Sequence, residues 1–133
     1  MHNIICLLID DDLDDQEIFS FIMERIEPSI KCAFANDGVY GLQKLKNRHQ
    51  QAPNIIFIDI NMPRMNGIQC LAEIKRIPQL DEVPIYMYST SAEQAIVKEC
   101  MKLGATGFIK KEAELAQLER KFAQILSQLH KSF

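Results

Sequence analysis

The sequence predicts an α/β fold, in which an open parallel sheet of five strands carries helices on both faces. Short apolar segments of strand length alternate with longer segments of helical periodicity, five times along the chain. Two of the short segments, Ile4–Ile9 and Ile55–Ile58, are almost entirely apolar. Such runs are typical of strands that are buried on both faces of a parallel sheet.

The predicted strands are about as long as strands in globular proteins usually are, at no more than about six residues. In chain order they are Ile4–Ile9, Lys31–Ala35, Asn54–Ile58, Ile85–Tyr88 and Gly107–Ile109. Periodicity gives no information on the order in which these strands lie side by side.

The helices are predicted from apolar residues that recur every three or four positions, because such residues share one helix face. In chain order these residues are Ile18, Ile22 and Ile26; Val39, Leu42 and Leu45; Ile68, Leu71 and Ile74; Ile96, Cys100 and Leu103; and Leu115, Leu118, Phe122, Ile125, Leu126 and Leu129. We expect a capping box of Asp14 and Glu17 at the start of the first helix. Gly104 is expected to end the fourth.

Composition indicates one globular domain. The chain has 133 residues, of which 47% are hydrophobic and 25% are charged, and its formal net charge of −3 gives no reason to expect nucleic-acid binding. Ile4–Ile9 is too short to cross a membrane and lacks the basic flank of a signal peptide. The four cysteines are widely spaced, without a C-x-x-C pair, so we expect free thiols in a reducing cytoplasm.

Polar residues follow four of the five predicted strands. They are Asp10 and Asp11 after the first strand, Asp59 after the third, Ser89 and Thr90 after the fourth, and Lys110 and Lys111 after the fifth. In parallel sheets of this kind the functional crevice lies at the carboxyl ends of the strands. We therefore expect these side chains to meet at one edge.

This set of residues suits phosphoryl chemistry. Three carboxylates can hold a Mg²⁺ ion, which prefers oxygen ligands. A carboxylate can itself accept a phosphoryl group and form an acyl phosphate. Lys111 can pair with one phosphate oxygen and Ser89 can donate a hydrogen bond to another. The remaining acids of the run, Asp12, Asp14 and Asp15, are expected to be solvated or to cap the first helix, whose N-terminus favours negative charge.

Four segments of the chain resemble the signature segments of response-regulator receiver domains, which have the CheY-like fold. They are IICLLIDDD, IIFIDINMPRMNG, PIYMYSTSAE and LGATGFIKK. The resemblance covers essentially the whole chain, and each segment falls at the end of its own predicted strand. It implies the strand order 2-1-3-4-5.

The resemblance also implies roles for individual residues. Asp59 matches the phosphoacceptor. Asp11 matches the acid that binds Mg²⁺ directly and Asp10 the acid that holds it through water. Asn61 matches the residue that gives its backbone carbonyl to the metal, and Ser89 the conserved hydroxyl.

Two further positions come from the fifth strand. Phe108 matches the aromatic switch residue of the family. The conserved lysine lies four residues beyond a glycine, and counting from Gly107 selects Lys111 over Lys110. The family has a proline after this lysine, often with a cis peptide, whereas this chain has Glu112. A cis peptide before a non-proline residue costs about 2.5–4 kcal/mol, and the sequence leaves open whether the Lys111–Glu112 peptide is cis or trans.

Three alternatives stay open at this point. A haloacid-dehalogenase-type phosphohydrolase needs D-x-D-x-T, but Asp59–Pro63 lacks the second acid. A flavodoxin-like cofactor protein shares the topology, but the acidic loop after the first strand would repel its phosphate. A docking module with an idle pocket would have no need of the complete set of site residues.

The sequence is therefore interpreted as a single-domain response regulator, with residues 1–133 forming a cytoplasmic receiver domain and no output domain. Its partners would be a sensor histidine kinase or phosphotransfer protein and a downstream protein target in trans, with no nucleic acid and no membrane. It would not be an enzyme, beyond catalysing its own phosphorylation and dephosphorylation. The switching surface, through which a homodimer could also form, would include parts of Ala92–Leu103, Gly107–Lys111 and Glu112–His130.

Overall fold

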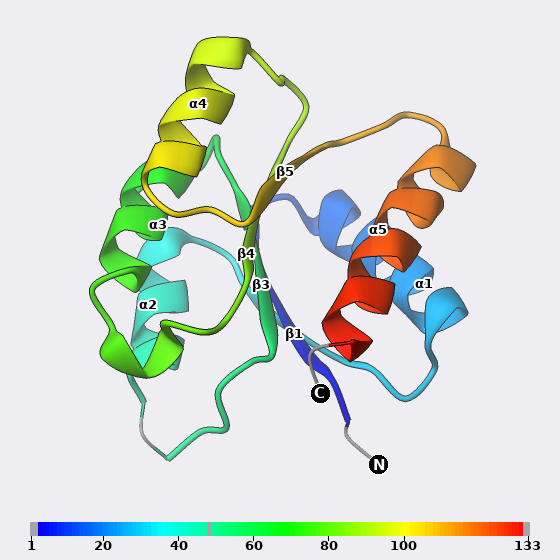
Figure 1. The fold of residues 1–133 in the computed structure, drawn as a ribbon, viewed down its shortest axis with the longest axis horizontal. Coiled ribbons are helices and arrows are strands. Elements are labelled where there is room, and N and C mark those ends of the chain that lie inside the picture. The colour runs from blue at the N-terminus through cyan, green and yellow to red at the C-terminus, as the bar shows by residue number, and fades with distance from the viewer. Residues whose placement is uncertain (1–2, 48, 132–133) are drawn as a thin grey trace.

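The computed structural model describes residues 3–47 and 49–131 and contains one parallel sheet of five strands in the order β2-β1-β3-β4-β5 (Figure 1). Both the predicted fold class and the predicted strand order are confirmed. The strands are β1 (Ile5–Ile9), β2 (Lys31–Ala35), β3 (Ile55–Asp59), β4 (Ile85–Ser89) and β5 (Gly107–Lys110).

Helices cover both faces of the sheet (Figure 1). One face carries α1 (Leu13–Ile26) and α5 (Leu115–His130). The other carries α2 (Gly38–Lys46), α3 (Gly67–Ile74) and α4 (Gln94–Lys102), with a short 3₁₀ turn at Pro78–Leu80 before β4.

The central strands are apolar throughout because they supply two separate cores. Successive side chains of a strand point to opposite faces of the sheet. Leu8 and Phe57 therefore pack with α1 and α5, where Phe19 and Phe122 lie, and Leu7 and Ile58 pack on the other side, with α2, α3 and α4. These six side chains are nearly inaccessible to solvent: Leu7, Leu8, Phe19, Phe57, Ile58 and Phe122.

The start of α1 differs from the prediction. Asp12 is the N-cap, and its carboxylate accepts hydrogen bonds from the backbone N–H groups of Asp14 (2.9 Å) and Asp15 (3.3 Å). The predicted capping box of Asp14 and Glu17 is wrong, because the helix already begins at Leu13 and Asp14 is helical. The predicted stop after α4 is correct: Gly104 has a φ of 105°, which favours glycine.

Cys6, Cys32, Cys70 and Cys100 are free thiols, as predicted. Within residues 3–47 and 49–131, no helix has the length and apolar character needed to cross a membrane.

Candidate functional site

Three aspartates meet where β1 and β3 end side by side. Ile9 pairs with Ile58 in the sheet, which places the residues that follow each of them at the same edge. Carboxylate oxygens of Asp10, Asp11 and Asp59 lie within 4.8 Å of one another. Asp10 is fully buried and Asp59 is 5% exposed, whereas Asp11 faces solvent. Two buried carboxylates so close together repel each other unless a positive charge compensates them.

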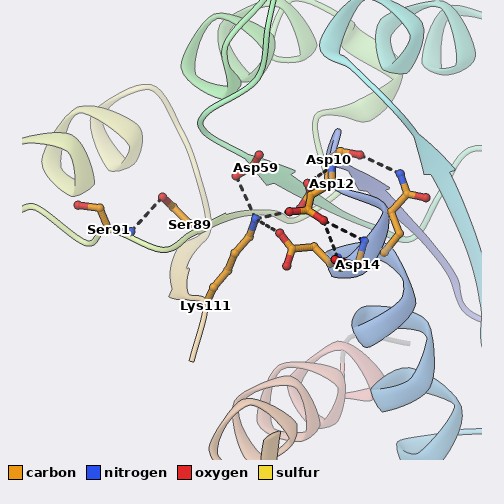
Figure 2. A network of polar contacts seen from close by, with 9 residues as sticks. Asp10, Asp12, Asp14, Asp59, Ser89, Ser91 and Lys111 are labelled. Atoms are coloured by element: carbon orange, nitrogen blue, oxygen red, sulfur yellow. Dashed lines mark hydrogen bonds and ion pairs between the residues drawn. The ribbon is translucent and has the colours of Figure 1, made fainter. Parts of the chain in front are cut away.

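Lys111 supplies one positive charge to this cluster (Figure 2). Its ammonium nitrogen, Nζ, donates to Asp59 Oδ1 at 3.2 Å, to Asp10 Oδ2 at 3.0 Å and to Asp15 Oδ2 at 2.6 Å. A lysine ammonium has three N–H donors, so these three carboxylates use all of them. The side chain of Lys111 is 10% exposed, and its charge is therefore poorly screened by water.

The backbone and a buried aromatic ring hold Lys111 in place. Its backbone N–H donates to the carbonyl oxygen of Ser89 at 2.7 Å. Its Nζ lies 4.9 Å from the centre of the Tyr88 ring, within the range of a cation–π interaction. Lys110 is exposed. Glu112 follows in place of the family's proline, and the described part of the chain contains no cis peptide.

The carboxylates outnumber the cation, and the pKa values of the two buried ones, Asp10 and Asp59, are raised mainly by burial. Burial, followed by the charge of Asp10, raises the pKa of Asp59 to about 6, although Lys111 acts in the opposite direction. Burial also raises the pKa of Asp10, again against the effect of Lys111. Burial alone would lower the pKa of Lys111, but its hydrogen bond to Asp15 and the charges of Asp10 and Asp59 raise it. The cluster thus retains more negative charge than Lys111 neutralises.

A hard divalent cation fits this excess of negative charge. The donors are carboxylate oxygens, which Mg²⁺ prefers. Two of these acids, Asp11 and Asp59, line a surface hollow whose lining also includes Asn61, Thr90 and Lys111. Asn61, which was predicted to bind the metal through its carbonyl, is therefore at the rim of the same hollow as the acids.

Two other predicted site residues, Ser89 and Phe108, lie on β4 and β5. Ser89 ends β4 and is 2% exposed, and its Oγ accepts a hydrogen bond of 3.3 Å from the backbone N–H of Ser91 (Figure 2). Phe108 is half-buried on β5 and packs against the core beneath α2, α3 and α4. The predicted switching roles of both residues stay predictions.

Asp15 is the site residue that the sequence did not reveal. It was expected to be solvated or to cap the helix, but its carboxylate forms the shortest of the three ion pairs of Lys111. The direction of helical side chains could have indicated this contact. Side chains of the first turn lean toward the helix N-terminus, which here points to the strand ends.

The loop between β3 and α3 holds the backbone around Asp59. Asn66 caps α3, and its capping box with Gln69 is complete. The backbone N–H of Gly67 donates to the carbonyl oxygen of Ile60 at 2.8 Å. Arg64 adopts a φ of 66° and forms an ion pair with Asp37, the N-cap of α2. The loop is thus fixed to both neighbouring helices.

Comparison with known proteins agrees with this architecture. The family model described as "response regulator receiver domain" matches residues 6–123. A protein-glutamate methylesterase/protein-glutamine glutaminase of Treponema denticola is 34% identical over 84% of this chain and 29% of its own length. The response regulator Rcp1 of Synechocystis is 25% identical over 86% of this chain and 80% of its own length. The chain spans only 29% and 36% of the length of two such methylesterases, from Treponema denticola and Desulfotalea psychrophila.

Solved structures share the fold. The phosphorylated cyanobacterial phytochrome response regulator RcpA has a TM-score of 0.88 at 22% identity, over 99% of this chain and 97% of its own. The Mn²⁺-bound form of Rcp1 has a TM-score of 0.81 at 24% identity, over 92% of this chain and 91% of its own. Because the family model covers nearly all of the strands and helices described above, the chain belongs to the response regulator receiver domains.

Proposed function

We propose that this receiver domain accepts a phosphoryl group on Asp59 in a Mg²⁺-dependent reaction and relays a signal of a two-component system. The observation that carries this proposal is the position of the Asp59 carboxylate. It lies at the carboxyl end of β3, next to a surface hollow, 3.2 Å from the Lys111 ammonium and within reach of two further carboxylates.

Asp10, Asp11, Asp59 and the backbone carbonyl of Asn61 are the groups that would hold Mg²⁺. The raised pKa values of Asp10 and Asp59 support this, since burial, with a smaller contribution from neighbouring acids, makes their charged forms costly in the absence of a cation. When bound, the ion would neutralise charge on the phosphoryl oxygens, and positioning together with charge neutralisation accounts for most of the catalysis in phosphoryl transfer.

The chain's own residues would carry the remaining steps. A carboxylate oxygen of Asp59 attacks the phosphorus atom of a phosphohistidine, the P–N bond breaks, and its electron pair stays on the imidazole of the donor. Asp59 must be ionised to do this, and a pKa of about 6 leaves most of it ionised at neutral pH. Lys111 pairs with one phosphoryl oxygen, and the hydroxyl group of Ser89 donates a hydrogen bond to another.

The proposed donors are a sensor histidine kinase or a phosphotransfer protein, and the proposed target is a separate protein. Phosphorylation would draw Ser89 inward, Phe108 would follow, and the surface of α4, β5 and α5 would change its partner preference. This surface carries exposed apolar side chains at Met101, Leu103 and Leu115, which suit a protein contact or a homodimer. The single-domain organisation and the cytoplasmic location stay predictions.

The experiment that tests this function is intact-mass measurement after incubation with acetyl phosphate, with and without Mg²⁺. We expect an alkali-labile adduct of one phosphoryl group that requires Mg²⁺ and is absent from Asp59→Asn. Asp14→Asn is the matched control, because it removes a carboxylate from the exposed first turn of α1 and should still form the adduct.

An adduct that persists in Asp59→Asn would contradict the assignment of Asp59. If no adduct forms and Mg²⁺ also fails to bind, the phosphorylation mechanism is wrong. The receiver fold would then serve as a docking module whose pocket is idle.

A further inference from the structure

We propose that Asp15 is a positioning residue that holds Lys111 and competes with the phosphoryl group for it. The site would therefore bind a phosphoryl group less tightly than the same site without this carboxylate. The inference rests on the proposed function, because it presumes that Lys111 pairs with a phosphoryl oxygen.

The first argument is the number of hydrogen-bond donors. Lys111 Nζ has three N–H groups, and Asp10, Asp15 and Asp59 accept from it at 3.0, 2.6 and 3.2 Å. The Tyr88 ring lies 4.9 Å from the same nitrogen. An arriving phosphoryl oxygen can gain an N–H donor from Lys111 only if one of the three carboxylates gives its contact up.

The three carboxylates differ in whether another positive charge would replace Lys111 after they lose their contact with it. Asp10 and Asp59 belong to the group of acids whose oxygens lie within 4.8 Å of one another and would face the metal, and Asp15 is not one of that group. The oxygens of Asp10 and Asp59 therefore regain a positive charge when Mg²⁺ binds. Asp15 does not, so its contact with Lys111 is the one that opposes the phosphoryl group.

The second argument is that Asp15 is held in place. It lies in the first turn of α1, and its backbone N–H donates to the capping carboxylate of Asp12 at 3.3 Å. Its contact with Lys111 joins residues 96 positions apart, across the end of the sheet. Its side chain is 24% exposed, so water only partly screens the pair. The competing carboxylate is thus part of the fold and does not need to be recruited.

Beryllofluoride binding at saturating Mg²⁺, followed by ¹⁹F NMR and calorimetry, tests this inference, since the anion mimics a phosphoryl group and no turnover is involved. We expect Asp15→Asn to bind it about threefold to tenfold more tightly than the parent chain, as one partly exposed charge-assisted contact is removed. Asp15→Glu keeps a carboxylate in the first turn and should restore an affinity close to that of the parent.

Asp14→Asn is the matched control. Asp14 also lies in the first turn of α1, and its backbone N–H also donates to Asp12. Its side chain is exposed, however, and the three carboxylates that accept from Lys111 are those of Asp10, Asp15 and Asp59. Its loss removes the same formal charge and the same favourable interaction with the helix dipole. We expect its affinity to change less than about twofold.

Three results would overturn the inference. Asp15→Asn and Asp14→Asn could tighten binding equally, which would indicate a general effect of charge. Asp15→Asn could weaken binding, which would show that Asp15 aids the phosphoryl group by orienting Lys111. Absence of Mg²⁺-dependent binding in the parent chain would overturn the proposed function together with this inference, whereas the first two results would leave the proposed function intact.

Discussion

Replacing Gly67 with alanine should destabilise the folded chain by about 3 kcal/mol and should disturb the backbone of Asp59, since overpacking against rigid neighbours costs about this much. A Cβ atom at Gly67 would lie 2.3 Å from the carbonyl oxygen of Asp59 and 2.7 Å from the Cα of Ile60. Both are backbone atoms of the strand end that carries the proposed phosphoacceptor, and they cannot rotate away. Urea denaturation measures the loss, and the acetyl phosphate reaction measures the displacement of Asp59.

Gly38→Ala is the matched control for this substitution. Gly38 is the first residue of α2 as Gly67 is of α3, and each follows an N-cap, Asp37 or Asn66. A Cβ at Gly38 would lie 3.1 to 3.3 Å from atoms of the Met65 side chain, which can move. We expect a change within about 1 kcal/mol. Equal stability of the two variants would show that the close approach at Gly67 does not exist in solution.

The fold could be predicted largely because strand burial leaves a simple pattern. Lys31–Ala35 has the observed bounds of β2. The ranges predicted for β1, β4 and β5 differ from the observed ones by one residue at one end, and the range predicted for β3 differs by one residue at both ends. Ile4 was assigned to β1 and lies just before it, yet its side chain is 1% exposed and belongs to the core. Such end residues cannot be assigned from hydrophobicity alone.

The site could be predicted in part, for a related reason. Parallel topology brings the ends of β1, β3 and β4 to one edge. Asp10, Asp11 and Asp59 could therefore be predicted as neighbours once the family resemblance had placed the first and third strands side by side. The acids that follow Asp11 in the sequence, Asp12, Asp14 and Asp15, have the same side chain, and their different roles depend on where α1 begins. Asp12 has an extended backbone and is the cap, and Asp15 lies in the first turn that follows and contacts Lys111. Neither fact can be read from a run of aspartates.

The excess negative charge of the site predicts an unusual dependence of stability on pH. Without Mg²⁺, the free energy of unfolding of the parent chain should rise relative to that of Asp59→Asn as pH falls from 8 to 5. In the folded chain, burial and then the charge of Asp10 raise the pKa of Asp59 to about 6 from a reference value of 3.8. The folded state therefore binds this proton more tightly than the unfolded state does.

The sign and the size of the effect follow from linkage. The stabilisation from the Asp59 proton is fully present below the unfolded pKa of 3.8 and is lost as pH rises through the folded pKa of about 6. Between pH 8 and pH 5 it should amount to about 1–2 kcal/mol, since one pKa unit corresponds to about 1.4 kcal/mol. Comparison with Asp59→Asn is essential, because the lowered pKa values of Asp37 and Glu112 act in the opposite direction in both proteins.

Urea denaturation of the parent chain and of Asp59→Asn at several pH values, with and without Mg²⁺, measures this difference. Asp14→Asn again serves as the control, because it removes a carboxylate from outside the buried cluster. Mg²⁺ should stabilise the parent most at pH 8, where Asp59 is ionised, and should reverse the advantage of Asp59→Asn there. If the parent and Asp59→Asn show the same pH dependence without Mg²⁺, Lys111 already neutralises Asp59, and the charge-based argument for a metal at this site fails. A difference that Mg²⁺ abolishes would mean that the burial and repulsion that make the ionised Asp59 costly in the metal-free fold are also what prepares this carboxylate for a cation.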